Sequence, residues 1–166
     1  MQLRGESDHN GGMENETAAA LEANPPTGFI HSGHRGPYTT HNGPYFHKIV
    51  DDQFWHGLRV MDRHCNAHGS LHGGMMTSFA DGLLATAVWH HAKLRGVTVR
   101  MVCDLVGAVA AGAWLEGTAR ITGQDDDIAF TAAEAYADGK LVFTATGVFR
   151  TYVRPGAHLK KMRSDS

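Results

Sequence analysis

The stretch that decides the fold reads NAHGSLHGG at residues 66–74 and continues as MMTSFADGLLATAVWHHA at residues 75–92. Its second part carries adjacent pairs of apolar residues every fourth position, which is the period of an α-helix with a broad buried stripe. These residues are Met75, Met76, Phe79, Ala80, Leu83, Leu84, Ala87 and Val88. We expect one long helix that ends at Arg95-Gly96, because a cation and a glycine are typical of a helix C-terminus.

Beyond this helix the apolar period changes to that of β-strands. Val97, Val99, Met101, Cys103 and Leu105 alternate with other residues, as they do in a strand. Further strands are predicted at residues 53–60, 114–122, 128–137 and 140–153, with Asp138-Gly139 as a hairpin turn between the last two. The order predicts an α+β layer of consecutive antiparallel strands with one helix. Because one helix cannot cover both faces of the sheet, the other face or an edge should meet a second copy.

Composition narrows the class of protein. The chain has 166 residues, with 15 basic against 17 acidic side chains and a net charge of −2, so no basic field recruits nucleic acid or a membrane surface. No apolar run reaches the roughly 18 residues of a membrane helix, and no signal-peptide pattern is present. Two free cysteines, together with the absence of a signal-peptide pattern, predict a cytoplasmic protein. We expect a flexible arm at residues 1–40, one domain at 41–155 and a polar tail at 156–166.

The start of the predicted helix carries groups that suit acyl chemistry. Gly73-Gly74 precede the helix, where unpaired N–H groups allow the close approach of a ligand oxygen. Asp81 falls among apolar helix residues, and an isolated buried carboxylate is costly unless it has partners or a task. Backbone donors near a carboxylate suit acyl transfer or hydrolysis. Alternatively, Asp81 has only a structural role, in which its carboxylate is hydrogen-bonded by a neighbouring hydroxyl, that of Thr77 or Ser78.

The combination of Asn66, Gly69, His72-Gly73-Gly74 and Asp81, at these spacings and before this helix, resembles the hotdog-fold acyl-CoA thioesterases. It is most similar to the PaaI-like group, from the phenylacetic acid pathway, in the 4-hydroxybenzoyl-CoA thioesterase superfamily. The resemblance covers residues 42–155. It implies a hotdog fold, in which an antiparallel sheet wraps around one long central helix, and hydrolysis of an acyl-CoA to a free acid and CoA.

The resemblance also implies roles for residues of this chain. Asp81 would be the general base or nucleophile, and the Gly73 N–H would polarise the thioester carbonyl. Asn66 would help to polarise that carbonyl or place the water, Thr98 would orient the water, and His72 would support the loop. The site would lie across a dimer interface, with Asp81 facing Asn66 and Gly73 of the partner. The assembly would be a homodimer or a dimer of dimers, a homotetramer. No metal or cofactor is implied beyond the CoA of the substrate.

Substrate contacts are less determined. Gly74, Met76 and Phe79 are candidate substrate-binding residues. The last two, together with Phe54, Trp55 and Trp89, either line an apolar acyl pocket or belong to the core. Some basic side chains could meet the CoA phosphates or be solvated: Arg150, Arg154, Lys160 and Lys161.

Three alternatives remain open at this point. The first is a metal site made by His64-Cys65, His68 and His72, although their spacing is not that of a zinc motif. The second is a hotdog hydratase or dehydratase, whose motif the segment from Asp62 to His68 imitates poorly. The third is a protein that binds acyl thioesters without catalysis, which would not need the Asp81 carboxylate.

Overall fold

The computed structural model describes residues 23–33 and 35–152. Their helices and strands are β1 (Ile30–His31), α2 (Pro37–His41), β2 (Tyr45–Val50), β3 (Gln53–Arg59), the 3-10 turn η1 (Asp62–His64), α3 (Gly73–Ala92), β4 (Arg95–Leu105), β5 (Trp114–Asp125), β6 (Ile128–Ala137) and β7 (Lys140–Tyr152).

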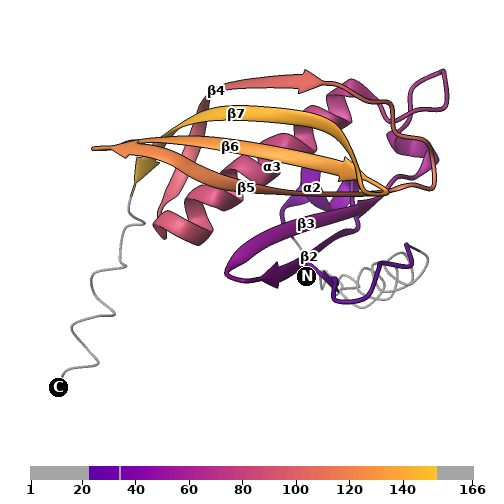
Figure 1. Cartoon of the computed structure of the whole chain (residues 1–166), viewed down its shortest axis with the longest axis horizontal. Helices are drawn as coiled ribbons and strands as arrows, with labels where there is room; N and C mark the ends of the chain where they lie inside the picture. Colours follow the sequence, from indigo (N-terminus) through magenta and orange to yellow (C-terminus); the bar gives the residue numbers. More distant parts are fainter. Residues whose placement is uncertain (1–22, 34, 153–166) are drawn as a thin grey trace, which may run out of the picture.

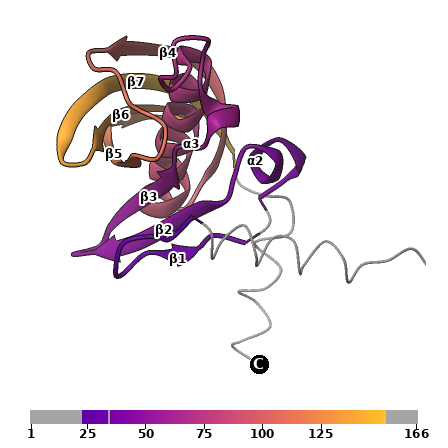
Figure 2. The same ribbon diagram turned by 90° about the vertical axis from the view of Figure 1, so that its right-hand side faces the viewer.

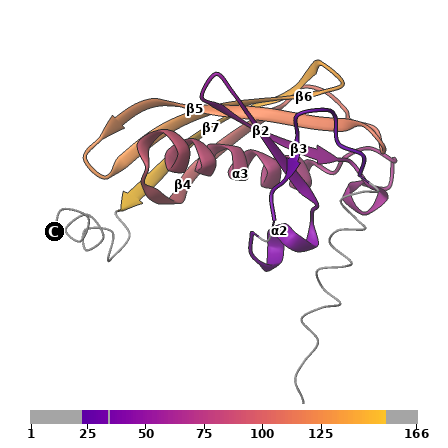
Figure 3. The same ribbon diagram turned by 90° about the horizontal axis from the view of Figure 1, so that it is seen from below.

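The strands form one antiparallel sheet in the order β1-β2-β3-β5-β6-β7-β4. The sheet curves around α3, which runs along its concave side (Figures 1 and 2). Helix α2 lies on the other side of α3, away from β5 and β6 (Figure 3). This arrangement confirms the predicted α+β fold with a single central helix. The hairpin at Asp138-Gly139 is confirmed as well, because β6 ends at Ala137 and β7 begins at Lys140.

Helix α3 is buried over most of its circumference. Its buried residues include every member of the predicted apolar stripe and also Thr86 and His90. The helix stops earlier than predicted: Lys93 caps it in the left-handed conformation, with φ of 56°. Arg95 and Gly96 instead begin β4, so the cation and glycine that resembled a helix end belong to the next strand. Of the helices described, none is long and apolar enough to cross a membrane.

Two glycines explain how closely the sheet fits the helix. A Cβ at Gly117 of β5 would lie 2.8 Å from Cδ1 of Leu83, and one at Gly147 of β7 would lie 3.0 Å from Cδ1 of Leu84. Each Cβ would also lie 2.8 Å from an atom of β6, the carbonyl oxygen of Glu134 for Gly117 and Oγ1 of Thr131 for Gly147. The two glycines therefore allow close packing both against α3 and against the neighbouring strand.

The folded domain begins before the predicted boundary at residue 40. Ala23 and Phe29 are buried in a second apolar cluster with Phe46 and Trp114. The Phe29 and Trp114 rings meet edge to face, with centroids 5.0 Å apart. No periodic signal marks β1, α2 or β2, because these elements are short. The rest of the predicted arm, residues 1–22, and the predicted tail, 156–166, lie outside the described residues.

Strand β4 forms a long edge of the sheet, hydrogen-bonded to β7 on one side only. Its exposed apolar side chains include Val97, Val99 and Leu105, which are 57%, 62% and 47% exposed. The pairing with β7 shifts register between Thr98 and Arg100, so Val99 is the extra residue of a β-bulge.

Candidate active site

Asp81 lies on the side of α3 that the sheet leaves open. It is half-buried, as are Thr77, Ser78 and Gly82 on the same side. Asp81 is less buried than the apolar residues around it in the sequence, for a geometric reason. Successive helix residues turn by about 100°, so Asp81 lies on a different side of the helix from the buried Phe79, and its carboxylate reaches the edge strand β4.

A hydroxyl from another element holds the Asp81 carboxylate. Thr98 Oγ1, on β4, donates to Asp81 Oδ1 at 2.7 Å. The two hydroxyls considered as local caps are engaged elsewhere, since Thr77 donates to the Gly73 carbonyl and Ser78 to the Gly74 carbonyl, each at 2.9 Å. In the described part of the chain, no donor contacts Oδ2 of Asp81. One carboxylate oxygen is thus fixed and the other is open to a ligand.

The N-terminus of α3 leaves one backbone donor uncommitted. His72 is the N-cap, and its Nδ1 accepts the Gly74 N–H at 2.9 Å. A Cβ at Gly74 would lie 2.9 Å from that nitrogen, so glycine there leaves room for the ring. The N–H groups of Met75 and Met76 bond to the His72 carbonyl. Among the residues described, none accepts from the N–H of Gly73.

Asn66 organises the loop before the helix. Its Oδ1 accepts the His68 N–H at 2.9 Å and the Ser70 N–H at 3.4 Å, and its Nδ2 donates to Ser70 Oγ at 3.1 Å. The backbone of Asn66 also pairs with the Ser70 carbonyl at 2.8 Å. The side chain therefore stabilises the turn, and one N–H of its amide group is left for a ligand.

A small cavity of about 110 Å³ opens beside Asp81. Phe79 contributes to its wall, whereas Met76, which is 4% exposed, belongs to the core. The remaining lining residues are Arg35, Tyr38, Thr39, Tyr45, His56, Ser78 and Gly82. Most of these come from the region between residues 35 and 56, and none of the lining residues from that region was predicted from the sequence. Tyr38 of α2 closes one wall by a 2.7 Å hydrogen bond between its hydroxyl and that of Ser78.

A hydrogen-bonded chain lies behind this cavity. His56 Nδ1 accepts from Arg35 Nη1 at 3.0 Å, and His56 Nε2 lies 2.8 Å from Thr86 Oγ1. Because a guanidinium only donates, Nε2 carries the ring hydrogen and donates to Thr86, which donates in turn to the Gly82 carbonyl at 2.8 Å. Burial, together with the charge of Arg35, lowers the pKa of His56 well below 6.5. Burial also raises the pKa of Tyr45 to about 12, so both groups are neutral at pH 7.

A second, larger cavity of about 680 Å³ shares Arg35 with the first. Its lining residues are Ser32, Arg35, His47, Phe54, Trp89, Arg95, Gly96 and Tyr152. Phe54 and Trp89, two of the candidate pocket residues from sequence, thus line a cavity. Trp55, the remaining candidate of these three aromatic residues, instead packs against the second apolar cluster.

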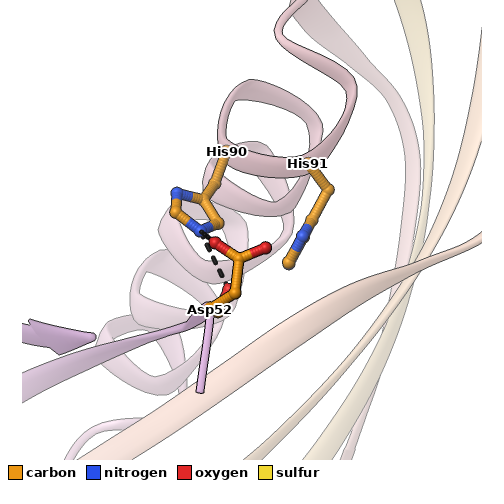
Figure 4. A group of neighbouring side chains, drawn as sticks. All are labelled: Asp52, His90 and His91. Carbon is orange, nitrogen blue, oxygen red and sulfur yellow. Dashed lines mark hydrogen bonds and ion pairs between the residues drawn. The ribbon is translucent and has the colours of Figure 1, made fainter. Parts of the chain in front are cut away.

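One group of side chains has the ligand types and spacing for a metal ion. Atoms of Asp52, His90 and His91 lie within 4.8 Å of one another (Figure 4). His90 Nε2 lies 2.9 Å from the Asp52 carbonyl oxygen and 3.3 Å from Oδ1 of the same residue. This nitrogen therefore donates a hydrogen bond here. His90 lies nine residues beyond Asp81, about 13.5 Å along the helix, so the group is separate from the Asp81 site.

The other predicted ligand groups are dispersed or engaged. Over residues 23–33 and 35–152, the cluster His64, Cys65, His68 and His72 does not come together around one point. His64 is buried and accepts the Met61 N–H. Of the basic residues considered for CoA phosphates, Arg150 pairs with Asp127 at 2.6 Å. The other three lie outside the described residues.

Comparisons with known proteins agree with this fold. Residues 68–144 match the model of the thioesterase superfamily. A Pseudomonas aeruginosa protein provisionally named an esterase, PA0474, is 33% identical over 129 residues, which are 76% of this chain and 96% of that protein. A variant of the phenylacetic acid degradation protein PaaI from Thermus thermophilus is 26% identical, with a TM-score of 0.60 over 69% of this chain and 99% of that one.

A thioesterase protein from Streptococcus pneumoniae, described as hypothetical and solved with coenzyme A, shares the fold. It is 20% identical, with a TM-score of 0.59 over 66% of this chain and 89% of that chain. The antiparallel sheet wrapped around one long helix, together with these matches, defines a hotdog protein of the thioesterase type. The chain belongs to the thioesterase superfamily.

Proposed function

We propose that this protein hydrolyses an acyl-CoA thioester, with Asp81 as general base or nucleophile and the Gly73 N–H as the donor to the thioester carbonyl. The observation that carries the proposal is the state of the Asp81 carboxylate. Thr98 donates to its Oδ1, while no donor among the described residues contacts Oδ2. A carboxylate held on one oxygen and free on the other can receive a proton from water or attack a carbonyl carbon.

As a base, Asp81 would work in two steps. It takes a proton from water while the water oxygen bonds to the carbonyl carbon, and the negative charge moves to the carbonyl oxygen. The C–S bond then breaks as the carbonyl re-forms, and the proton on Asp81 passes to the departing CoA sulfur. As a nucleophile, Asp81 would attack the carbonyl carbon and expel the CoA thiolate, which takes a proton from water, as the C–S bond breaks and a mixed anhydride forms. Water then hydrolyses the anhydride to the free acid and restores the Asp81 carboxylate. Both routes need a donor at the carbonyl oxygen.

The donor for one Asp81 has to come from a second copy of the chain. Gly73 is eight residues before Asp81, about 12 Å along the same helix. That separation is too great for both groups to act on one carbonyl. A second helix, antiparallel to the first along the open side, would bring its Gly73 towards Asp81. The Asn66 loop precedes that Gly73 and would come with it.

The edge strand supports such an assembly. Strand β4 carries exposed valines beside unpaired backbone groups, and a long open edge of this kind favours pairing with another strand. Antiparallel pairing of β4 with its copy would continue the sheet and place the open sides of the two α3 helices together. A homodimer is the smallest assembly that completes the site, and a dimer of dimers would contain it twice.

The structure of a pneumococcal thioesterase with coenzyme A is consistent with an acyl-CoA substrate. The test is release of free thiol from a panel of aryl and aliphatic acyl-CoA compounds, with the mass in solution measured in parallel by light scattering. We expect hydrolysis of at least one class by a particle of two or four times 18.0 kDa. Full activity in a stable monomer would overturn the shared site. Tight acyl-CoA binding with no thiol release would favour the non-catalytic alternative.

A further inference from the structure

Arg35 occupies an unusual electrostatic position. It lines the small cavity together with Asp81, and it also lines the larger cavity. Its side chain therefore borders both spaces. Within the described residues no carboxylate lies within ion-pair distance of it. An unneutralised cation in the wall of two cavities is a position suited to an anionic ligand.

The guanidinium is also held in place. Nη1 bonds to His56 Nδ1 at 3.0 Å, and Nη2 lies 3.5 Å from Thr86 Oγ1. His56 is 2% exposed, and its lowered pKa keeps the ring neutral, so that Nδ1 remains an acceptor. These contacts use two of the five N–H groups of an arginine. The remaining three can bind an anion in the fork geometry that suits carboxylate and phosphate.

The larger cavity adds to this positive character. Its lining includes a second guanidinium, Arg95, and no Asp or Glu among the described residues. His47, which accepts or donates a 3.0 Å bond with Ser32, has its pKa lowered by burial and by Arg35. Aromatic rings of Phe54, Trp89 and Tyr152 complete the wall. A volume of about 680 Å³ is within the range of small-molecule sites.

We propose that Arg35, assisted by Arg95, binds an anionic group of the substrate and so determines which thioesters are hydrolysed and in which direction they lie. This inference rests on the proposed thioesterase function. The negative charge of Asp81 repels an anionic group from the thioester end of the substrate. The positive charge of Arg35 attracts an anionic group at a position further from Asp81. A neutral thioester carbonyl would lie at Asp81, and the anionic group would lie beyond Arg35. The anion is either a carboxylate on the acyl group or a phosphate of CoA.

The experiment compares three substrates with the full-length chain. Glutaryl-CoA carries a carboxylate on a five-carbon acyl group, pentanoyl-CoA is its neutral counterpart, and pentanoyl-pantetheine carries no phosphate. Each is assayed for kcat/KM with the wild type, Arg35→Gln and the control Arg120→Gln, an exposed arginine of β5 that lines neither cavity. Circular dichroism confirms that each variant is folded.

A carboxylate site predicts that Arg35→Gln lowers kcat/KM for glutaryl-CoA about 10- to 100-fold more than for pentanoyl-CoA, as for loss of a charge-assisted hydrogen bond. A phosphate site predicts an equal loss with both CoA substrates and no loss with pentanoyl-pantetheine. Equal effects on all three, or none, would overturn the proposal.

A chain with no hydrolytic activity would contradict the proposed function and leave the anion site to be judged by binding. Calorimetric titration of glutarate and of CoA into the wild type and into Arg35→Gln tests the anion site independently of hydrolysis. Weaker binding of either ligand to the variant, by tenfold or more, supports the site. Unchanged binding, or no binding to the wild type, overturns it.

Discussion

The hydroxyl of Thr98 and the carboxylate of Asp81 are joined by a 2.7 Å hydrogen bond from the edge strand β4 to the open side of α3. The hydroxyl fixes Oδ1 and so orients the carboxylate plane. Because Thr98 lies on the strand that we propose as the subunit contact, the orientation of the Asp81 carboxylate depends on the structure of that edge.

Asp81→Asn should remove nearly all turnover while the chain stays folded. The amide keeps the shape but cannot take a proton or attack, and the interaction that is lost acts mainly in the transition state. Affinity for acyl-CoA should stay within a few-fold. Steady-state kinetics and calorimetry check this, with Asp126→Asn, an exposed turn residue, as the control. Retention of more than a tenth of the wild-type rate would rule out Asp81 as the essential group.

Thr98→Val should reduce kcat by about 10- to 150-fold, because it removes the donor to Asp81 Oδ1 and keeps the side-chain volume. A net loss of about 1.5–3 kcal/mol is typical for hydrogen bonds to charged groups, and about 1.4 kcal/mol corresponds to a factor of ten. Thr98→Ser restores the hydroxyl and should recover most of the rate. If valine and serine behaved alike, the hydroxyl would have no role in turnover.

Gly73→Pro tests the backbone donor without breaking the helix. Gly73 is the first helical residue, a position that favours proline, and the extended His72 before it, with ψ of 136°, suits a following proline. We expect kcat to fall by about 10²- to 10³-fold, as on loss of one oxyanion donor. Gly73→Ala is the control: its N–H remains, and its Cβ would lie 3.2 Å from the flexible end of Leu105. Similar rates for the two variants would argue against the donor.

Acid should destabilise the fold through buried histidines. Burial lowers the pKa of His56 well below 6.5 and that of His64 to about 4. Below pH 6.5 the unfolded chain binds protons that the folded chain refuses, so stability is full above this pH and falls as the pH drops. Two such groups predict a loss of about 2–3 kcal/mol between pH 7.5 and 5.5.

Urea unfolding at a series of pH values measures this slope. His64→Gln should reduce the pH dependence of the unfolding free energy by the contribution of one histidine. The control His68→Gln, at an exposed position, should leave this pH dependence unchanged. A slope in His64→Gln equal to that of the wild type would show that His64 is not the responsible group.

The helix and the long strands could be predicted because their apolar residues repeat with a clear period. The first part of the domain could not: β1 has two residues and α2 has five, too few for any period. The cavity residues Arg35 and His56 were missed for the same reason, because only tertiary packing brings them to Asp81. Asp81 itself was found by its position after the glycines, and its open surroundings follow from the helical turn rather than from its sequence neighbours.

The bulge at Val99 has a consequence for how this site changes between related chains. Without the extra residue, and with residues 100–105 kept in register with β7, the side chains of β4 before the bulge, including Thr98, would exchange faces of the sheet. The spacing between a helix carboxylate and its strand hydroxyl is therefore set by the presence or absence of one residue. A single insertion or deletion in this strand would move the hydroxyl to or from the carboxylate as effectively as a substitution, so a gap in a sequence alignment here carries chemical meaning.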